Sequence, residues 1–361
     1  MIELMRENKI LLIIIILLCS LMDNCRPNPK SHKVDNNFIK KYFEKGLNES
    51  QFSGGVIELE RQFSFPDVDL EDKGIFFMSP SKLACDESGN IYVVDSRANR
   101  VYKFNSSGHF LNQIGQQGNG PGEFSIPNDL LIHRDKLIIS DLGNYRIQFL
   151  DFEGKYIKSF NKYLTFYSMA INDDSLLVAA PLVYENKSSQ INVLTQEGKI
   201  IHSFGQPMHF RKDPIRLNFV EIDINMKGEL LVAFRYLALV RKYSKKGELL
   251  DEYKLNNEAM KKFENMNLAR NSIGTKESKE AYIMIINSIK AYEDGFFILS
   301  NSKCPIILGY DDQGHQNAVY WIQDCNYIAK DFLVQNKERK KIFYLLQVYP
   351  NLKIDAFGQK Q

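Results

Sequence analysis

Apolar and polar residues alternate over short stretches along most of this chain, which is the pattern of half-buried β-strands. Two stretches share one strand–turn–strand layout, from Asn90 to Gly115 and from Lys136 to Phe160. Between them lies a linker rich in glycine and proline, from Gly115 to Phe124. A β-unit that recurs across such a linker indicates a repeat architecture.

Each repeat is marked by a glycine between two alternating runs, where it predicts the turn that joins the third and fourth strands. Successive markers lie 44 to 49 residues apart, except for one longer interval, and this spacing fits a four-stranded blade. The markers are Gly108, Gly154, Gly198, Gly247, Gly314 and Gly358. Six markers predict an all-β fold, a six-bladed β-propeller of four-stranded antiparallel blades.

The last repeat is incomplete. Ile342 to Gly358 aligns with Ile91 to Gly108 and supplies the second and third strands, after which the sequence ends. Val56 to Phe63 alternates apolar and polar residues and precedes the first full blade. We therefore expect this N-terminal strand to complete blade six, so that strands from both ends of the sequence close the ring.

The long interval predicts one insertion, about residues 256–289, between blades four and five. An amphipathic helix is indicated by apolar residues at helical spacing: Ala259, Met260, Phe263, Met266 and Leu268. Ala281 to Ile286 fits either a second helix or the inner strand of blade five. The insertion is expected to pack on a propeller face, and a lid over the central funnel is the functional alternative.

The first 25 residues have the layout of an export signal. Arg6 and Lys9 precede an unbroken apolar run, Ile10 to Leu18, which suits a signal peptide better than a membrane span. Cys25 is followed by a polar segment that contains proline, as in bacterial lipoproteins with lipid on the cysteine. A retained N-terminal anchor and simple secretion remain alternatives. The expected location is the periplasm or the outer membrane.

Residues 26–51 are predicted to be a tether with a short helix, and residues 52–361 the propeller. Three further cysteines fall in the propeller. Cys85 lies in an apolar strand and is expected to be a small buried hydrophobe. Cys304 and Cys325 fall in one repeat and are candidates for a disulfide in an oxidising compartment.

Composition narrows the range of partners. The net charge is +2 and both signs are spread along the chain, so no basic stripe indicates nucleic acid. The single tryptophan, Trp321, argues against propellers that carry a Trp-Asp signature in each blade.

Blades one and two resemble the NHL-repeat propellers, and especially the six-bladed β-propeller lipoproteins of Gram-negative bacteria. The resemblance rests on the linker Gly118 to Phe124 and on two copies of an Asp that is followed by Asn, Arg and a β-branched residue. Blades three to six match in spacing and alternation only. Many members of this family have no assigned activity.

The motif residues have a structural interpretation. The carboxylates of Asp95 and Asp141 can accept backbone N–H groups across the turn, and Arg100 and Arg146 can pair with them or with a neighbouring blade. The linker residues Gly120, Pro121 and Gly122 are expected to form a turn. A phosphate cradle is the weaker alternative, because no Gly-Lys-Ser/Thr follows.

Ligand-binding candidates fall in loops that usually line one mouth of a propeller channel. They are Arg97, Asn144, Tyr184, Arg235, Tyr236 and Lys303. Their mixed charge suits a polar ligand or a protein partner, although each taken alone also fits a solvated loop residue.

Two functions remain open. The tether and the family resemblance favour a binding or scaffold module for an envelope protein, peptide or glycan, with no cofactor and no catalytic residue assigned. The alternative is a metal-dependent hydrolase or lyase, like the related gluconolactonase-like and peptide-amidating propellers, with a Ca or Zn ion in the channel. The six histidines are scattered, and neither a Gly-x-Ser-x-Gly nor a His-Glu-x-x-His motif is present.

Overall fold

The structure, a computed structural model, describes residues 55–66, 75, 77–161, 166–181, 189–272, 282–293, 295–302, 304–322, 327–337, 340–349 and 352–360. The predicted signal peptide, Cys25 and the predicted tether lie outside these ranges, as do Tyr184, Lys303 and Cys325.

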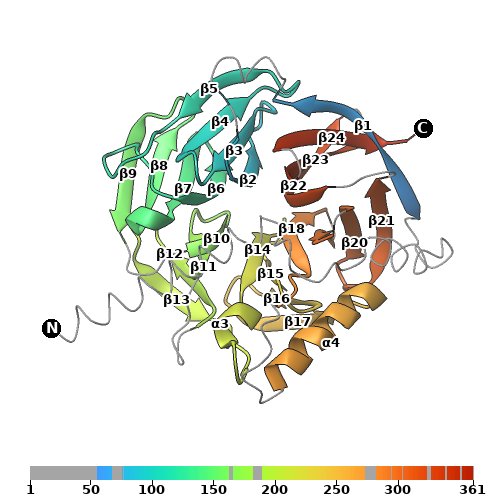
Figure 1. The fold of residues 1–361 in the computed structure, drawn as a ribbon. Coiled ribbons are helices and arrows are strands. Elements are labelled where there is room, and N and C mark those ends of the chain that lie inside the picture. The colour runs from blue at the N-terminus through green and yellow to red at the C-terminus, as the bar shows by residue number, and fades with distance from the viewer. Residues whose placement is uncertain are drawn as a thin grey trace.

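Six antiparallel blades surround a central axis, as predicted, with the first strand of each blade nearest the axis (Figure 1). Blade one contains β2 (Pro80–Cys85), β3 (Ile91–Asp95), β4 (Arg100–Phe104) and β5 (Phe110–Ile114). Blade two contains β6 (Pro127–His133), β7 (Lys136–Asp141), β8 (Arg146–Asp151) and β9 (Tyr156–Asn161). Blade three contains β10 (Phe166–Ile171), β11 (Leu177–Pro181), β12 (Ile191–Leu194) and β13 (Ile200–Phe204).

The second half of the ring continues the same order. Blade four contains β14 (Val220–Ile224), β15 (Leu230–Phe234), β16 (Leu239–Tyr243) and β17 (Leu249–Lys254). Blade five contains β18 (Ile286–Tyr292), β19 (Gly295–Ser300), β20 (Ile306–Asp311) and β21 (Gln316–Ile322). Blade six contains β22 (Ile328–Lys337), β23 (Lys340–Tyr349), β24 (Lys353–Gln359) and, from the other end of the chain, β1 (Val56–Phe65).

The strand β1 closes the ring as the sequence predicted. It pairs antiparallel with β24, with Glu60 opposite Gly358, and so forms the fourth strand of blade six. It also pairs in parallel with β21, with Val56 opposite Val319, which the sequence did not indicate. Blades five and six therefore form one continuous eight-stranded sheet through β1 (Figure 1).

Second strands are buried on both faces because each blade lies between two others. In β3, Ile91 and Val93 pack toward blade six, whereas Tyr92 and Val94 pack toward blade two. All five residues of this strand are buried. The core thus consists of layers between neighbouring blades, which explains why these strands are continuously apolar rather than alternating.

Five of the six marker glycines lie in the predicted turns between third and fourth strands. They have φ between +77° and +89°, and an added Cβ would lie 2.3–2.8 Å from a side chain on the outer strand of the preceding blade. The pairs are Gly108 with Phe65, Gly154 with Ile114, Gly198 with Phe160, Gly247 with Phe204 and Gly314 with Tyr253. Gly358 is the exception: it lies within β24, because β1 supplies the next strand without a turn.

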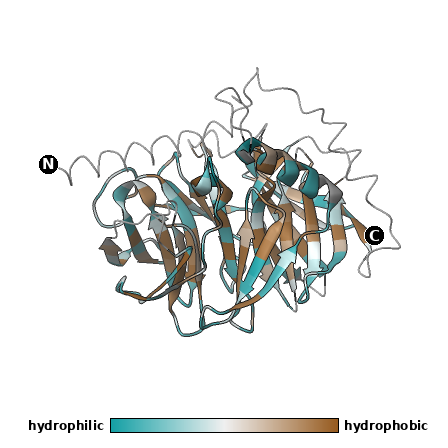
Figure 2. Cartoon of the chain, turned by 90° about the horizontal axis from the view of Figure 1, so that it is seen from below, coloured by the Kyte–Doolittle hydropathy of each residue, from teal (hydrophilic) through white to brown (hydrophobic). Residues whose placement is uncertain are grey.

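The predicted insertion contains α4 (Glu258–Ser272), which lies on one face of the disc between blades four and five (Figure 2). Its Met260 and Phe263 are buried in the layer between these two blades. The segment from Ile286 is the inner strand β18 rather than a second helix. The short helices α3 (Pro214–Leu217) and η3 (Leu142–Asn144) lie in connections. Within the described residues, none of the helices is both apolar and long enough to cross a membrane.

Candidate functional site

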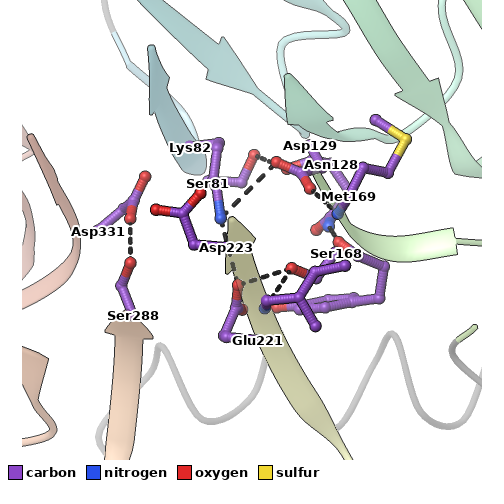
Figure 3. Close-up of polar contacts among 12 residues, drawn as sticks. Ser81, Lys82, Asn128, Asp129, Ser168, Met169, Glu221, Asp223, Ser288 and Asp331 are labelled. Carbon is purple, nitrogen blue, oxygen red and sulfur yellow. Dashed lines mark hydrogen bonds and ion pairs between the residues drawn. The ribbon is translucent and has the colours of Figure 1, made fainter. Parts of the chain in front are cut away.

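Each inner strand contributes one polar side chain to a ring around the propeller axis. In five blades a β-bulge precedes this position, whereas the pairing of β14 with β15 in blade four is regular. Equivalent positions in the six strands carry Lys82, Asp129, Ser168, Glu221, Ser288 and Asp331, which we call the axial ring (Figure 3). Residues 39 to 67 positions apart in the sequence thus meet at one place.

Lys82 lies among the carboxylates of the axial ring. Its Nζ is 3.2 Å from Glu221 Oε2 and 3.7 Å from Asp129 Oδ1 (Figure 3). Burial alone would lower the pKa of Lys82, but the nearby carboxylates of Asp129, Glu221 and Asp331 hold that pKa well above its usual value. The lysine is therefore a permanent cation at the centre of the ring.

The pKa values of the two aspartates of the ring are shifted in opposite directions. Burial raises the pKa of Asp129 to about 6, although Lys82 opposes the shift. Burial acts in the same direction on Asp331, but Lys290 at 3.5 Å and then Lys82 outweigh it, so the pKa of Asp331 is lowered. The raised pKa of Asp129 brings the titration of this carboxyl, in blade two, closer to neutral pH.

The same side chains connect neighbouring blades. Asp129 Oδ2 accepts a hydrogen bond from the Met169 N–H (2.6 Å), and Ser168 Oγ accepts one from the Ile222 N–H (3.1 Å). Asp331 Oδ2 accepts one from the Leu83 N–H (2.9 Å), across the junction of blades six and one. The axial ring thus has a structural role, because it satisfies buried N–H groups of adjacent inner strands.

A small polar cavity lies against the ring. Its empty volume of about 250 Å³ includes space open to solvent. The lining combines Ser81, Lys82, Asn128, Tyr167, Glu221, Arg235, Asn287, Lys330 and Asp331. Five of these residues occupy the bulges near the start of an inner strand, namely Ser81, Asn128, Tyr167, Asn287 and Lys330. Arg235 directly follows β15. The cavity is therefore at the end of the channel where the loops between second and third strands lie.

Arg235 is 2% exposed and connects the cavity with the insertion. Its Nη1 donates to the Tyr167 hydroxyl (2.7 Å) and is 3.1 Å from Glu221 Oε1. The guanidinium carbon lies 5.4 Å and 5.3 Å from the ring centroids of Tyr167 and Phe219. Its Nη2 donates to Met284 Sδ (3.1 Å), and its backbone carbonyl accepts from the Ile285 N–H (2.7 Å).

The insertion is fixed to the propeller beside Arg235. The buried Asn267 of α4 donates to the carbonyls of Tyr236 (2.8 Å) and Ile283 (2.7 Å) and accepts from the Ile283 N–H (2.8 Å). Glu264 accepts from the Ala238 N–H at 3.1 Å. These bonds tie α4 to the loop that carries Arg235, so the helix is fixed beside this residue.

Of the sequence-predicted binding residues, Arg235 lines the cavity and the other described ones do not. Tyr236 is buried and Arg97 is exposed. Asn144 uses its amide for structure, donating to the Gly118 carbonyl and to Asp141 Oδ2, each at 2.9 Å. Tyr184 and Lys303 lie outside the described residues.

Sequence reasoning missed the axial ring. The available signal was a charged residue inside a largely apolar inner strand, as at Lys82 in Pro80–Cys85 and at Asp129 in Pro127–His133. Such a residue is unusual in a buried strand unless it is paired. The sequence could not identify the partner of each charged residue, because that partner belongs to another blade.

The Asp–Arg motifs differ between the two blades. Asp95 accepts four backbone N–H bonds, from Met78, Ser79, Arg97 and Ala98. In blade two, Arg146 Nε donates to Asp141 Oδ2 (2.8 Å), and the guanidinium also donates to linker carbonyls, including Gly120 O. Arg100 instead donates to Ala98 O and to Gln113.

The remaining residues singled out from the sequence are those of the linker and the cysteines. Gly122 donates its N–H to Gln148, while Pro121 lies between the two motif glycines. Cys304 is disulfide-bonded, and because Cys325 lies outside the described residues its pairing stays a prediction. Cys85 is half-buried. Among the described residues, no group of three His, Cys, Asp or Glu side chains is arranged to hold a metal ion.

Comparison with known proteins identifies the fold independently. A family profile described as a 6-bladed beta-propeller matches residues 68–327. Human NHL repeat-containing protein 3 is 31% identical over 94 residues, which are 25% of this chain and 27% of that protein. The brain tumor protein of Drosophila melanogaster is 24% identical over 136 residues, 37% of this chain and 13% of that protein. The chain thus spans less than a third of these relatives.

Solved structures share the architecture. A protein of Bacteroides fragilis named as exported has a TM-score of 0.58 at 14% identity, over 85% of this chain and 99% of that one. A virginiamycin B lyase of Staphylococcus aureus has a TM-score of 0.52 at 13% identity, over 84% of this chain and 100% of that one. At these identities the likeness concerns the fold alone.

Proposed function

Because the chain belongs to a family of 6-bladed β-propellers, we propose that it is an exported, lipid-anchored binding module for a protein, peptide or glycan of the cell envelope. The observation that carries this proposal is the polar cavity at the mouth of the channel. Every blade contributes to the axial ring that the cavity adjoins, and most of the cavity's polar groups are fixed by neighbours. A preorganised polar site of this kind suits recognition, because little ordering is required on binding.

The electrostatics favour binding over a metal-dependent reaction. A catalytic metal needs converging carboxylate or histidine ligands with an open position for water. Here the carboxylates of Asp129 and Glu221 converge on the Lys82 ammonium. The lysine supplies the positive charge that a bound cation would bring, so a metal would have to displace it.

Export is supported by two independent observations. The first 25 residues have the charge and apolar pattern of a signal peptide that ends at Cys25. The similar B. fragilis structure is also named as an exported protein. A lipid on Cys25 followed by the tether would hold the propeller at a membrane surface, where its mouth is accessible to envelope components.

The binding proposal is tested with two matched lysine variants of the full chain on arrays of envelope-derived peptides and glycans. Lys330 is a half-buried cation of the cavity lining, and Lys199 is exposed beside the β12–β13 turn on the opposite face. Lys330→Ala should weaken binding about tenfold or more, because hydrogen bonds to charged groups contribute about 1.5–3 kcal/mol. Lys199→Ala should leave binding unchanged. Equal effects of the two variants would contradict a site at this mouth.

The metal-dependent alternative is tested by mass spectrometry of purified protein before and after EDTA. We expect no stoichiometric Ca or Zn and no change in melting temperature with EDTA. One tightly held metal per chain would instead favour the enzyme and would justify a screen of lactones and esters.

A further inference from the structure

Arg235 is unusual because one edge of its guanidinium has no strong acceptor. Its Nη1 forms an ion pair with Glu221 and donates a hydrogen bond to Tyr167. The opposite edge is formed by Nε and Nη2, and its one acceptor among the described residues is the Met284 thioether, which accepts from Nη2. The Nε atom is buried and has no hydrogen-bond partner. A thioether is a weak acceptor, and a buried donor without a partner is costly. This is the edge that binds carboxylates side-on in other proteins.

The positive charge of Arg235 is also only partly balanced by a neighbouring carboxylate. Glu221 is the ion-pair partner of two cations at once, with Oε2 3.2 Å from Lys82 Nζ and Oε1 3.1 Å from Arg235 Nη1. Arg235 therefore has no carboxylate of its own. A further anion at its open edge would balance the second cation, provided that the anion approaches from the side away from Glu221.

The Met284 side chain covers the Nε–Nη2 edge of Arg235 and can move away from it. The residue is half-buried, and its side chain has three rotatable bonds. Its backbone is held, because its carbonyl accepts from Asn301 (3.1 Å) and the adjacent Ile285 N–H donates to Arg235 O (2.7 Å). The side chain can therefore swing aside while the chain around it stays in place.

We propose that the Nε–Nη2 edge of Arg235 is the receptor for a carboxylate group of the ligand, and that Met284 covers it until the ligand displaces the thioether. The inference rests on the proposed binding function and specifies its ligand chemistry. Two parallel N–H donors match the two oxygens of one carboxylate. A phosphate would bring a second negative charge close to Glu221, so the site favours a singly charged group.

The test builds the ligand group into the chain. Met284→Glu places a carboxyl carbon where methionine has its sulfur, and Met284→Gln is the neutral control of the same shape. At neutral pH the glutamate variant should melt about 2–4 °C above the glutamine variant, the shift expected for one net charge-assisted interaction. The difference should shrink as the pH falls below about 4, the ordinary pKa of a glutamate, and should disappear once the carboxyl paired with Arg235 is protonated. A glutamate variant that melts at or below the glutamine variant at neutral pH would overturn the proposal.

Binding is then measured directly with acetate as the carboxylate probe and acetamide as the neutral control. Acetate should raise the melting temperature of the wild type and of Met284→Gln, but not of Met284→Glu, whose edge is already occupied. An equal acetate effect on all three proteins would place the anion elsewhere and refute the site.

The two proposals fail in different ways. If no envelope peptide or glycan binds but the acetate and Met284→Glu results are as expected, the receptor edge stands and the macromolecular ligand is wrong. If array binding depends on Lys330 but Met284→Glu leaves it intact, the binding function stands and the carboxylate site is wrong.

Discussion

Gly154 shows how a single residue serves two neighbouring blades. Its φ of +89° forms the turn between β8 and β9, and a Cβ at this position would lie 2.7 Å from Ile114 Cγ2 of blade one. The glycine is thus required both by the turn and by the close approach of the preceding blade. The same contact occurs between Gly108 and Phe65, where β1 replaces the missing fourth strand of blade six.

Two alanine substitutions distinguish the cost of backbone strain from the cost of the close inter-blade contact. Gly122 has a similar φ of +76°, but its nearest neighbouring atoms are 3.9 Å from an added Cβ. Gly122→Ala should therefore cost only the backbone strain, about 1–2 kcal/mol. Gly154→Ala should cost about 1–3 kcal/mol more, because the methyl group also overpacks against Ile114. Urea unfolding of both variants measures the difference in the free energy of unfolding. Equal decreases would show that Ile114 moves aside for the added methyl group at no cost.

Asp129 predicts a specific dependence of stability on pH. Its folded-state pKa is raised from 3.8 to about 6 by burial, with Lys82 opposing the shift and Glu221 adding to it. The folded state therefore binds the proton more tightly, and the contribution is fully present below pH 3.8 and lost as the pH rises to about 6. A shift of about two pKa units corresponds to roughly 3 kcal/mol.

The variant Asp129→Asn removes this titration. The free energy of unfolding of the wild type should fall relative to that of the variant between about pH 4 and pH 6, and then stay level. Urea unfolding at a series of pH values measures this difference. A difference that stays constant, or that rises over this window, would show that Asp129 titrates as an ordinary aspartate.

At the scale of elements, β1 determines how the ring closes. It holds β24 by antiparallel pairing and β21 by parallel pairing, and it places Phe65 between blades six and one. The Phe65 ring lies 5.1 Å from that of Phe104 in blade one. A strand from the N-terminal part of the chain thus performs the packing that the fourth strand of every other blade performs within its own hairpin.

The contribution of β1 is tested at Phe65, with Phe63 as a matched control on the same face of the strand. Phe65 is 1% exposed, whereas Phe63 is half-buried. Phe65→Ala should lower the free energy of unfolding by about 3–5 kcal/mol, with a clearly smaller loss for Phe63→Ala. Urea midpoints at equal slope provide the measurement. Similar losses for both would show that the six–one junction depends little on this side chain.

At the scale of the whole molecule, the ring creates a site that belongs to no single blade. The axial ring takes one residue from each inner strand, and Asp331 of blade six bonds the Leu83 N–H of blade one across the closure. The insertion adds α4 to the same end of the channel through Asn267 and the Tyr236 carbonyl. Tyr167 of blade three and Met284 of the insertion contact Arg235 at this end of the channel, so its burial depends on neighbours outside its own blade.

The proposed membrane anchor is a property of the whole exported chain and is tested on it. Radiolabelled palmitate should label the wild type in cells but not Cys25→Ala, because lipid is expected on this cysteine alone. Cys85→Ala serves as the matched control and should keep its label. Equal labelling of wild type and Cys25→Ala would refute lipidation at this position.

Much of the architecture was predictable because its signals are local. The turn glycines, the alternation of Val56 to Phe63 and the long interval before Gly314 each occupy contiguous residues. They predicted the blades, the closing strand and the insertion, all of which the structure contains. The prediction that Gly358 marks a turn was wrong, because a strand from the other end of the chain follows it in space.

The sequence by itself therefore determined the repeating strands, their number and the way in which the ring closes, since these depend on periodicity and turn chemistry within one repeat. Only the tertiary structure decided the site. Lys82, Asp129, Glu221 and Asp331 come from four different blades, and their mutual distances depend on ring closure rather than on spacing in the chain. Arg235 looked like a loop residue, and its burial follows from the insertion and from blade three, which cover it from both sides.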